Sequence, residues 1–243
     1  SNPYLPKDTE EVRPVQPEEE EEATSYNVLT GQVETTEQTK KGFEEKAEKV
    51  ESFLDIGNSS PEEIQKTVYK VGKKYKARDI RGAINVVSKV LGNSEVQKNT
   101  KSFLTEIVNA ESSFGRDETT NKKESNIVGP WQVGMGDNQA YTEILIRLDP
   151  TSPVYRPKLQ ENLDKFIATS WGKEIDWLNL SKKDMMNPLI NATIARLYIS
   201  TMDEDAIPAD KTKRAELWKR IYNTKADKKG TVAYYLSKNL DMP

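Results

Sequence analysis

One carboxylate, Glu111, has the setting of a proton donor. It lies in the stretch FLTEIVNAESSFG, residues 103–115, whose apolar spacing predicts a helix. Leu104 and Ile107 precede Glu111 by seven and four residues, and Phe114 follows it by three, so Glu111 shares a face with apolar side chains. Burial raises the pKa of a carboxyl group and lets it act as an acid near neutral pH. The alternative interpretation is an ordinary glutamate at the rim of a helix end, which is the commoner case.

The composition restricts the chemistry that is available. The 243 residues include no Cys and no His, which excludes Ser-His and Cys-His catalysis, disulfides and thiolate metal sites. We expect no metal and no cofactor. The sequence has no run of about 18 apolar residues that would predict a membrane span. It shows no signal-peptide pattern, and because it starts at Ser1 we expect a chain that has been trimmed, processed or tagged.

Glu111-Ser112 is the first of four short blocks between residues 95 and 240. The others are Gly129-Pro130-Trp131-Gln132-Val133, then Asn187-Pro188-Leu189-Ile190-Asn191-Ala192 with Tyr198, and then Arg220-Ile221-Tyr222-Asn223 ahead of Lys229-Gly230-Thr231. This ordered series resembles the soluble lytic transglycosylases of the lysozyme superfamily, and also the goose-type lysozymes. That family has an E-S pair closing a helix, a G-L-M-Q-[IV] turn, a P-x-x-N-x-x-x-A-x-x-Y-L helix and an A-Y-N turn. Pro130, Trp131 and Ile221 depart from the pattern, which leaves the shape of the cleft and its glycan preference open.

The resemblance implies roles for the residues of the first two blocks. Glu111 would be the catalytic acid. Ser112 would help to hold the helix end, or would simply be a polar residue near a helix terminus. Gln132 would line the cleft on a turn that needs Gly129 for close backbone approach, or would be an exposed turn amide.

The resemblance also implies a second wall of the cleft. Tyr222 and Asn223 would face the scissile bond from the side opposite Glu111, although Tyr222 could instead be a core aromatic residue beside Trp218. Trp131 could stack on a sugar ring, but a tryptophan is as readily a buried core residue. The predicted substrate-binding residues are therefore Ser112, Trp131, Gln132, Tyr222 and Asn223.

Glycoside cleavage usually requires two carboxylates, and no convincing second one follows from the sequence. Glu124 and Asp137 are the candidates, but both lie in predicted polar loops, where acidic residues are common. A lytic transglycosylase, as the resemblance implies, uses one glutamic acid as acid and then as base on the bond between N-acetylmuramic acid and N-acetylglucosamine, and leaves a 1,6-anhydro end. A hydrolytic goose-type lysozyme or endolysin that activates water with Glu124 or Asp137 stays open. So does an inactive structural protein with a lysozyme-like fold.

The charge distribution divides the chain. Residues 1–60 carry 15 acidic and 6 basic side chains, whereas the remaining 183 residues carry 24 and 30. We predict an acidic, extended or disordered leader over residues 1–58, with a short helix possible at 42–54, a helical part over 59–92 and a lysozyme-like catalytic region over 93–243. The predicted fold is mostly α. Helical patterns start at the Ser-Ser-Pro-Glu-Glu of residues 59–63 and recur at 78–92, 93–114, 159–171, 188–202, 211–223 and about 231–240; residues 141–148 fit a strand or a helix.

The expected partners are peptidoglycan strands and, through the acidic leader, other virion proteins. No nucleic-acid motif is present. An enzyme with this leader and this altered family pattern would suit a bacteriophage particle that opens the cell wall during genome entry. A bacterial periplasmic enzyme is the main alternative.

Overall fold

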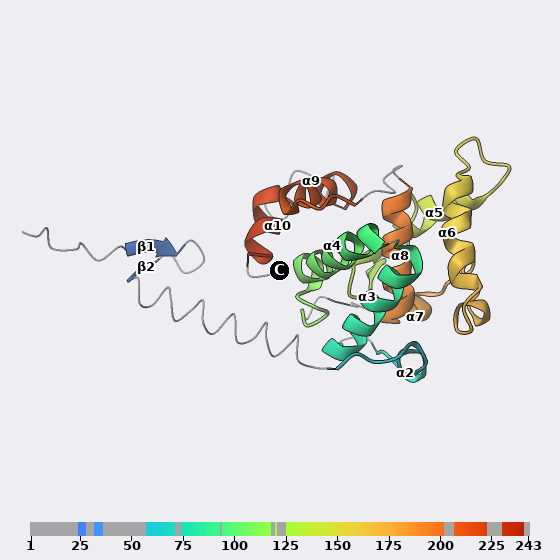
Figure 1. Cartoon of the computed structure of the whole chain (residues 1–243), viewed down its shortest axis with the longest axis horizontal. Coiled ribbons are helices and arrows are strands. Elements are labelled where there is room, and N and C mark those ends of the chain that lie inside the picture. Colours follow the sequence, from blue (N-terminus) through green and yellow to red (C-terminus); the bar gives the residue numbers. More distant parts are fainter. Residues whose placement is uncertain are drawn as a thin grey trace, which may run out of the picture. The chain divides into compact units, whose positions relative to one another are not determined.

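The computed structural model describes residues 57–70, 74–92, 94–117, 120, 125–201, 207–222 and 230–240, together with two strands nearer the N-terminus. The described part is mostly helical, as predicted (Figure 1). The chain divides into two compact units, residues 1–48 and 49–243. Each is described by itself.

The helices of the second unit follow one another with little strand between them. In chain order the elements are α2 (Pro61–Lys66), α3 (Ala77–Leu91), α4 (Ser94–Ser112), β3 (Ile127–Val128), β4 (Val133–Gly134), α5 (Ala140–Leu148), α6 (Pro157–Ile167), the short 3-10 helix η1 (Gly172–Glu174), α7 (Lys182–Met185), α8 (Pro188–Ser200), α9 (Lys211–Ile221) and α10 (Val232–Lys238). The ambiguous segment 141–148 is therefore helix, as part of α5. The short helix α7 was not predicted.

The first unit contains an antiparallel pair of strands, β1 (Thr24–Asn27) and β2 (Gln32–Thr35). Tyr26 lies opposite Val33 in its register. The sequence analysis did not predict these two strands within the leader. The rest of residues 1–56, including the possible helix at 42–54, lies outside the described residues.

The helix that starts at Pro61 is shorter than its apolar spacing predicts. Its start is as expected: Ser60 accepts from the backbone N–H of Glu63, and the Glu63 carboxylate accepts from the N–H of Ser60. The helix ends at Lys66 because Thr67 adopts an extended conformation, with its hydroxyl bonded back to the carbonyl of Glu63. Val68, which fits the apolar stripe, is consequently 69% exposed.

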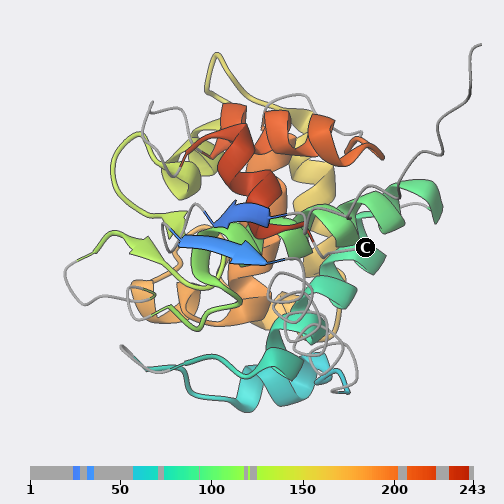
Figure 2. The same ribbon diagram turned by 90° about the vertical axis from the view of Figure 1, so that its left-hand side faces the viewer.

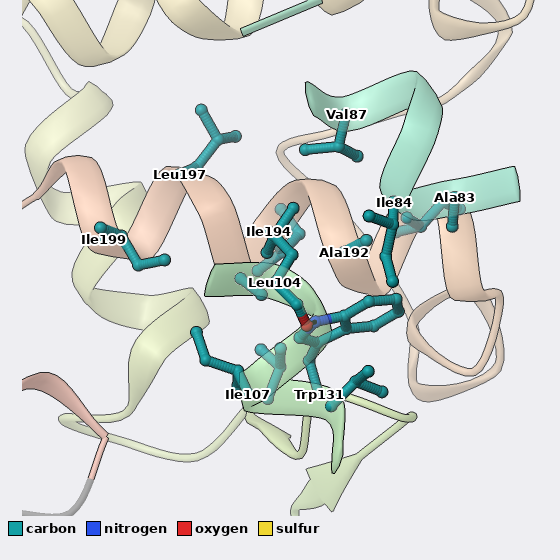
Figure 3. Close-up of a cluster of buried hydrophobic side chains, with 14 of the residues drawn as sticks. Ala83, Ile84, Val87, Leu104, Ile107, Trp131, Ala192, Ile194, Leu197 and Ile199 are labelled. Atoms are coloured by element: carbon teal, nitrogen blue, oxygen red, sulfur yellow. Dashed lines mark hydrogen bonds between the residues drawn. The ribbon is translucent and has the colours of Figure 1, made fainter. Parts of the chain in front are cut away.

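The core forms where α3 packs against both α8 and α4. Figure 3 shows Ile84 and Val87 of α3, Leu104 and Ile107 of α4 and Ile194 of α8 in one buried cluster. Helix α8 is buried along almost its whole length, with Tyr198 as its partly exposed residue. A helix that is buried on all sides is the centre of a domain.

Helices α9 and α10 pack on each other, and α10 also packs on α4 (red helices in Figures 1 and 2). A buried ion pair holds this arrangement. Arg214 of α9 donates through Nε and Nη2 to the two carboxylate oxygens of Glu106 on α4, at 2.8 and 2.7 Å. The Tyr235 hydroxyl of α10 donates to the same carboxylate at 2.8 Å. One acid on α4 therefore fixes both C-terminal helices.

Candidate active site

The carboxyl end of α4 has an unusual backbone. Ser113 and Phe114 have φ of 48° and 60°, in the left-handed region that residues other than glycine rarely adopt, and Gly115 follows at 69°. Each such non-glycine conformation costs on the order of 1–3 kcal/mol. Ser112 compensates within the same turn, since its hydroxyl accepts from the backbone N–H of Gly115 at 2.8 Å. The helix therefore ends abruptly, one residue after Glu111.

Glu111 is partly buried and is held by a residue of another helix. Its Oε1 accepts a hydrogen bond from the indole Nε1 of Trp218 on α9 at 2.8 Å. Trp218 is fully buried. The predicted apolar environment of Glu111 thus includes an oriented N–H donor.

Tyr222, the C-cap residue that follows α9, is close enough to Glu111 to be affected by its charge. Burial, followed by the Glu111 carboxylate and then Tyr198, raises the pKa of Tyr222 well above its usual value. Its hydroxyl oxygen is buried and has no hydrogen-bond partner among the described residues. Its ring meets Tyr198 of α8 edge-on, with 6.0 Å between the ring centres. A buried hydroxyl without a partner calls for an explanation, and the described residues contain three others, those of Ser88, Thr100 and Thr120.

Helix α10 and the turn after α4 complete the surroundings of Glu111. Burial and then the Glu111 carboxylate raise the pKa of Tyr234, and Asp117 contributes in the same direction. Glu111 also contributes to the rise in the pKa of Tyr235, although burial and Glu106 contribute more. The Glu111 carboxylate therefore acts electrostatically on Tyr222 and on two tyrosines of α10, and Asp117 acts on one of these, Tyr234.

The predicted cleft turn, residues 129–132, is held by α4 and α8. Ser112 donates to the carbonyl of Pro130 at 2.6 Å. Asn191 of α8 accepts from the N–H of Trp131 at 2.8 Å and donates to the carbonyl of Val128 at 3.0 Å. Gly129 has φ +78°, and a Cβ on it would lie 2.3 Å from Cγ of Asn191, so glycine is required there.

Gln132 follows on this turn with φ 51° and is partly exposed. Its Nε2 donates to the carbonyl of Gly129 at 2.7 Å, so the side chain is folded back on its own turn. Because Ser112 joins this turn to the end of α4, the structure links the Gln132 and Glu111 blocks through one hydrogen bond.

Two predicted substrate contacts are wrong. Trp131 is fully buried and donates through Nε1 to the carbonyl of Leu104 at 2.9 Å, so it is a core residue and cannot stack on a sugar (Figure 3). Ser112 is also fully buried, and both functions of its hydroxyl are internal. The other prediction for Ser112, that it holds the helix end, is confirmed by these bonds.

The other predicted site residues are not brought together with Glu111 by any described contact. Asn223 and Glu124 lie outside the described residues. Asp137 is exposed in the loop between β4 and α5. A carboxylate that the sequence did not single out, Glu143 of α5, pairs with Arg147 and adds to the rise in the pKa of Tyr198, after burial.

Sequence reasoning missed the contact of Trp218 with Glu111. A signal was present, because Trp218 precedes Tyr222 by four residues and must share its face of α9. Tyr234 had no comparable signal. Its position follows from the packing of α10, which starts at the Thr231 cap, against α4.

The described residues contain no group of three acidic, His or Cys side chains that could hold a metal ion. Within the same ranges, no helix is both long and apolar enough to cross a bilayer. No protein-family profile, curated protein or solved structure matches the chain. The family resemblance and the function it implies therefore stay predictions.

Proposed function

We propose that the chain is a peptidoglycan-cleaving lytic transglycosylase with Glu111 as its single acid and base. The observation that carries this proposal is the carboxylate of Glu111, which Trp218 Nε1 holds at 2.8 Å at an abrupt helix end and which helps to raise the pKa of the buried Tyr222 hydroxyl. An oriented, partly buried carboxyl group beside tyrosines suits proton transfer to a bound sugar.

The chemistry requires one carboxyl group. Neutral Glu111 gives its proton to the glycosidic oxygen, and the bond from that oxygen to the anomeric carbon of N-acetylmuramic acid breaks. The carboxylate then takes the proton of the muramoyl 6-hydroxyl, whose oxygen closes on the anomeric carbon. The product is a 1,6-anhydro sugar, and Glu111 ends as it began.

A hydrolytic lysozyme is the second candidate, because Asp117 acts on Tyr234 together with Glu111. A hydrolase of this kind needs a second carboxylate about 5–9.5 Å from the first, as nucleophile or as base for water. Asp117→Asn separates the two, since it would abolish hydrolysis but leave an anhydro-forming reaction largely intact.

The test of the proposal is Glu111→Gln, which keeps the shape of the side chain and removes the acidic proton. General acid catalysis contributes about 10²–10⁴-fold, so we expect cleavage of purified sacculi to fall by at least about 100-fold. Thermal unfolding should change little, because a glutamine oxygen can still accept from Trp218. Glu174→Gln, at an exposed position in η1, is the matched control and should retain full activity. Sacculus clearing by Glu111→Gln at the wild-type rate would remove Glu111 from the mechanism.

We also propose that the enzyme is carried in a phage particle and is attached by its acidic N-terminal segment. The charge contrast supports this: residues 1–60 hold 15 acidic against 6 basic side chains, unlike the rest of the chain. The protein should then co-purify with intact virions. Its absence from washed particles would favour a periplasmic enzyme.

A further inference from the structure

We propose that Trp218 is a positioning residue for Glu111: its indole N–H binds Oε1, fixes the orientation of the carboxyl group and favours the catalytic proton on Oε2. The inference rests on the proposed function, in which Glu111 is the acid. It assigns a role to a residue outside the four blocks of the family resemblance.

Trp218 is a rigid donor. Its side chain is fully buried, and its ring packs against Tyr235 and Tyr234 with ring centres 4.9 and 6.5 Å away. Four residues earlier on α9, Arg214 makes its two hydrogen bonds to Glu106 of α4. The helix that supplies the donor is therefore anchored to the helix that supplies the acid, one to two turns from Glu111.

The indole N–H can only donate. Oε1 of Glu111 must act as its acceptor, and a carboxyl proton on Oε1 would weaken that bond. In the neutral acid the proton is therefore favoured on Oε2. When Glu111 later acts as a base, the same bond holds the carboxylate in place without reorganisation.

The bond also affects the protonation equilibrium, because a hydrogen bond donated to a carboxylate favours its charged form. Other titratable groups act electrostatically on Glu111 or on its tyrosine neighbours. They are Tyr222 of α9, Tyr234 and Tyr235 of α10, Asp117 after α4, and, through Tyr222, Tyr198 of α8 with the Glu143–Arg147 pair of α5. Removing the indole N–H should therefore raise the pKa of Glu111.

Trp218→Phe tests this, since it keeps a buried aromatic ring and deletes the donor. A hydrogen bond to a charged group is worth about a 10- to 150-fold effect, so kcat on a soluble glycan strand should fall by about that factor while KM changes little. The alkaline limb of the pH profile should move upward by about one pH unit, because the acid stays protonated to higher pH. Trp177→Phe is the matched control: its indole donates to a backbone carbonyl, that of Gly172, at 2.9 Å, and the limb should stay in place.

A second measurement depends neither on the folding of Trp218→Phe nor on activity. In the NMR spectrum of the full wild-type chain, one of the four indole N–H signals should shift as Glu111 titrates, and the shift should be absent in Glu111→Gln. Four indole signals that do not respond to Glu111 would overturn the inference. So would a Trp218→Phe profile identical to that of Trp177→Phe in an enzyme that Glu111→Gln inactivates. A wild-type chain that does not cleave glycan would instead refute the proposed function, and the NMR titration would still report on Trp218.

Discussion

Replacing Arg214 with Met removes the partner of a carboxylate that is 1% exposed. In the wild type, the Glu106 carboxylate accepts from Arg214 Nε and Nη2 and from the Tyr235 hydroxyl, all within 2.8 Å. In Arg214→Met only the tyrosine remains, so a buried charge is left without its counterion. Breaking a buried pair in this way costs about 3–5 kcal/mol of unfolding free energy. The measurement is urea denaturation followed by far-ultraviolet circular dichroism.

Two further variants separate the charge effect from lost packing. Glu106→Gln combined with Arg214→Met removes the unpaired charge and keeps an acceptor for Tyr235, so it should recover most of the lost stability. Lys158→Met breaks an exposed pair, with Lys158 57% and Glu161 62% exposed, and should cost at most about 1 kcal/mol. A double variant that is no more stable than Arg214→Met alone would refute the reasoning, because the loss would then come from packing and from the bonds that Arg214 donates to the carbonyls of Pro208 and Ala209.

Two other predictions concern the turn at Gly129 and the buried tyrosines. Gly129→Ala should lower the unfolding free energy by about 1–3 kcal/mol in urea denaturation, because it combines φ +78° with a Cβ placed 2.3 Å from the Asn191 side chain. Gly57→Ala, where a Cβ meets nothing within 4 Å, should change little, and equal losses in the two variants would contradict the explanation. Burial raises the pKa values of Tyr222 and Tyr235 in the folded state, so the unfolded state releases protons first and stability should fall as pH rises above about 10, by at most about 1.4 kcal/mol per pH unit for each tyrosine. Tyr222→Phe should make this alkaline slope shallower in unfolding measurements; an unchanged slope would show that the hydroxyl is not protected.

The helices could largely be predicted from the sequence, and the exceptions have physical causes. Residues 78–92 carry a regular apolar stripe that ends at Gly92, and α3 follows it. The apolar spacing after Pro61 also predicts helix at Val68, and this was wrong. The helix ends at Lys66, because the hydroxyl of Thr67 bonds to the carbonyl of Glu63 and Thr67 is extended, which apolar spacing does not predict. Strands β1 and β2 were not predicted, because each has only four residues and the acidic composition around them indicates an extended or disordered segment.

The sequence predicted individual residues of the candidate site, but not the contacts between helices that bring them together. The apolar face on which Glu111 lies follows from spacing within one helix. Its bond to Trp218 joins residues 107 positions apart, and depends on how α9 packs beside α4. For Trp131 the sequence left two interpretations open, and the space between α4 and α8, which only the folded chain defines, makes it a core residue.

The most direct test of the central claim is the chemical form of the products when the wild-type chain digests purified sacculi in isotopically labelled water. If Glu111 acts alone as acid and base, mass spectrometry will find muropeptides with 1,6-anhydro ends, lighter by one water than reducing ends and free of solvent label. Reducing N-acetylmuramic acid ends that carry the label would show that water attacks the anomeric carbon, and would contradict the single-carboxylate mechanism.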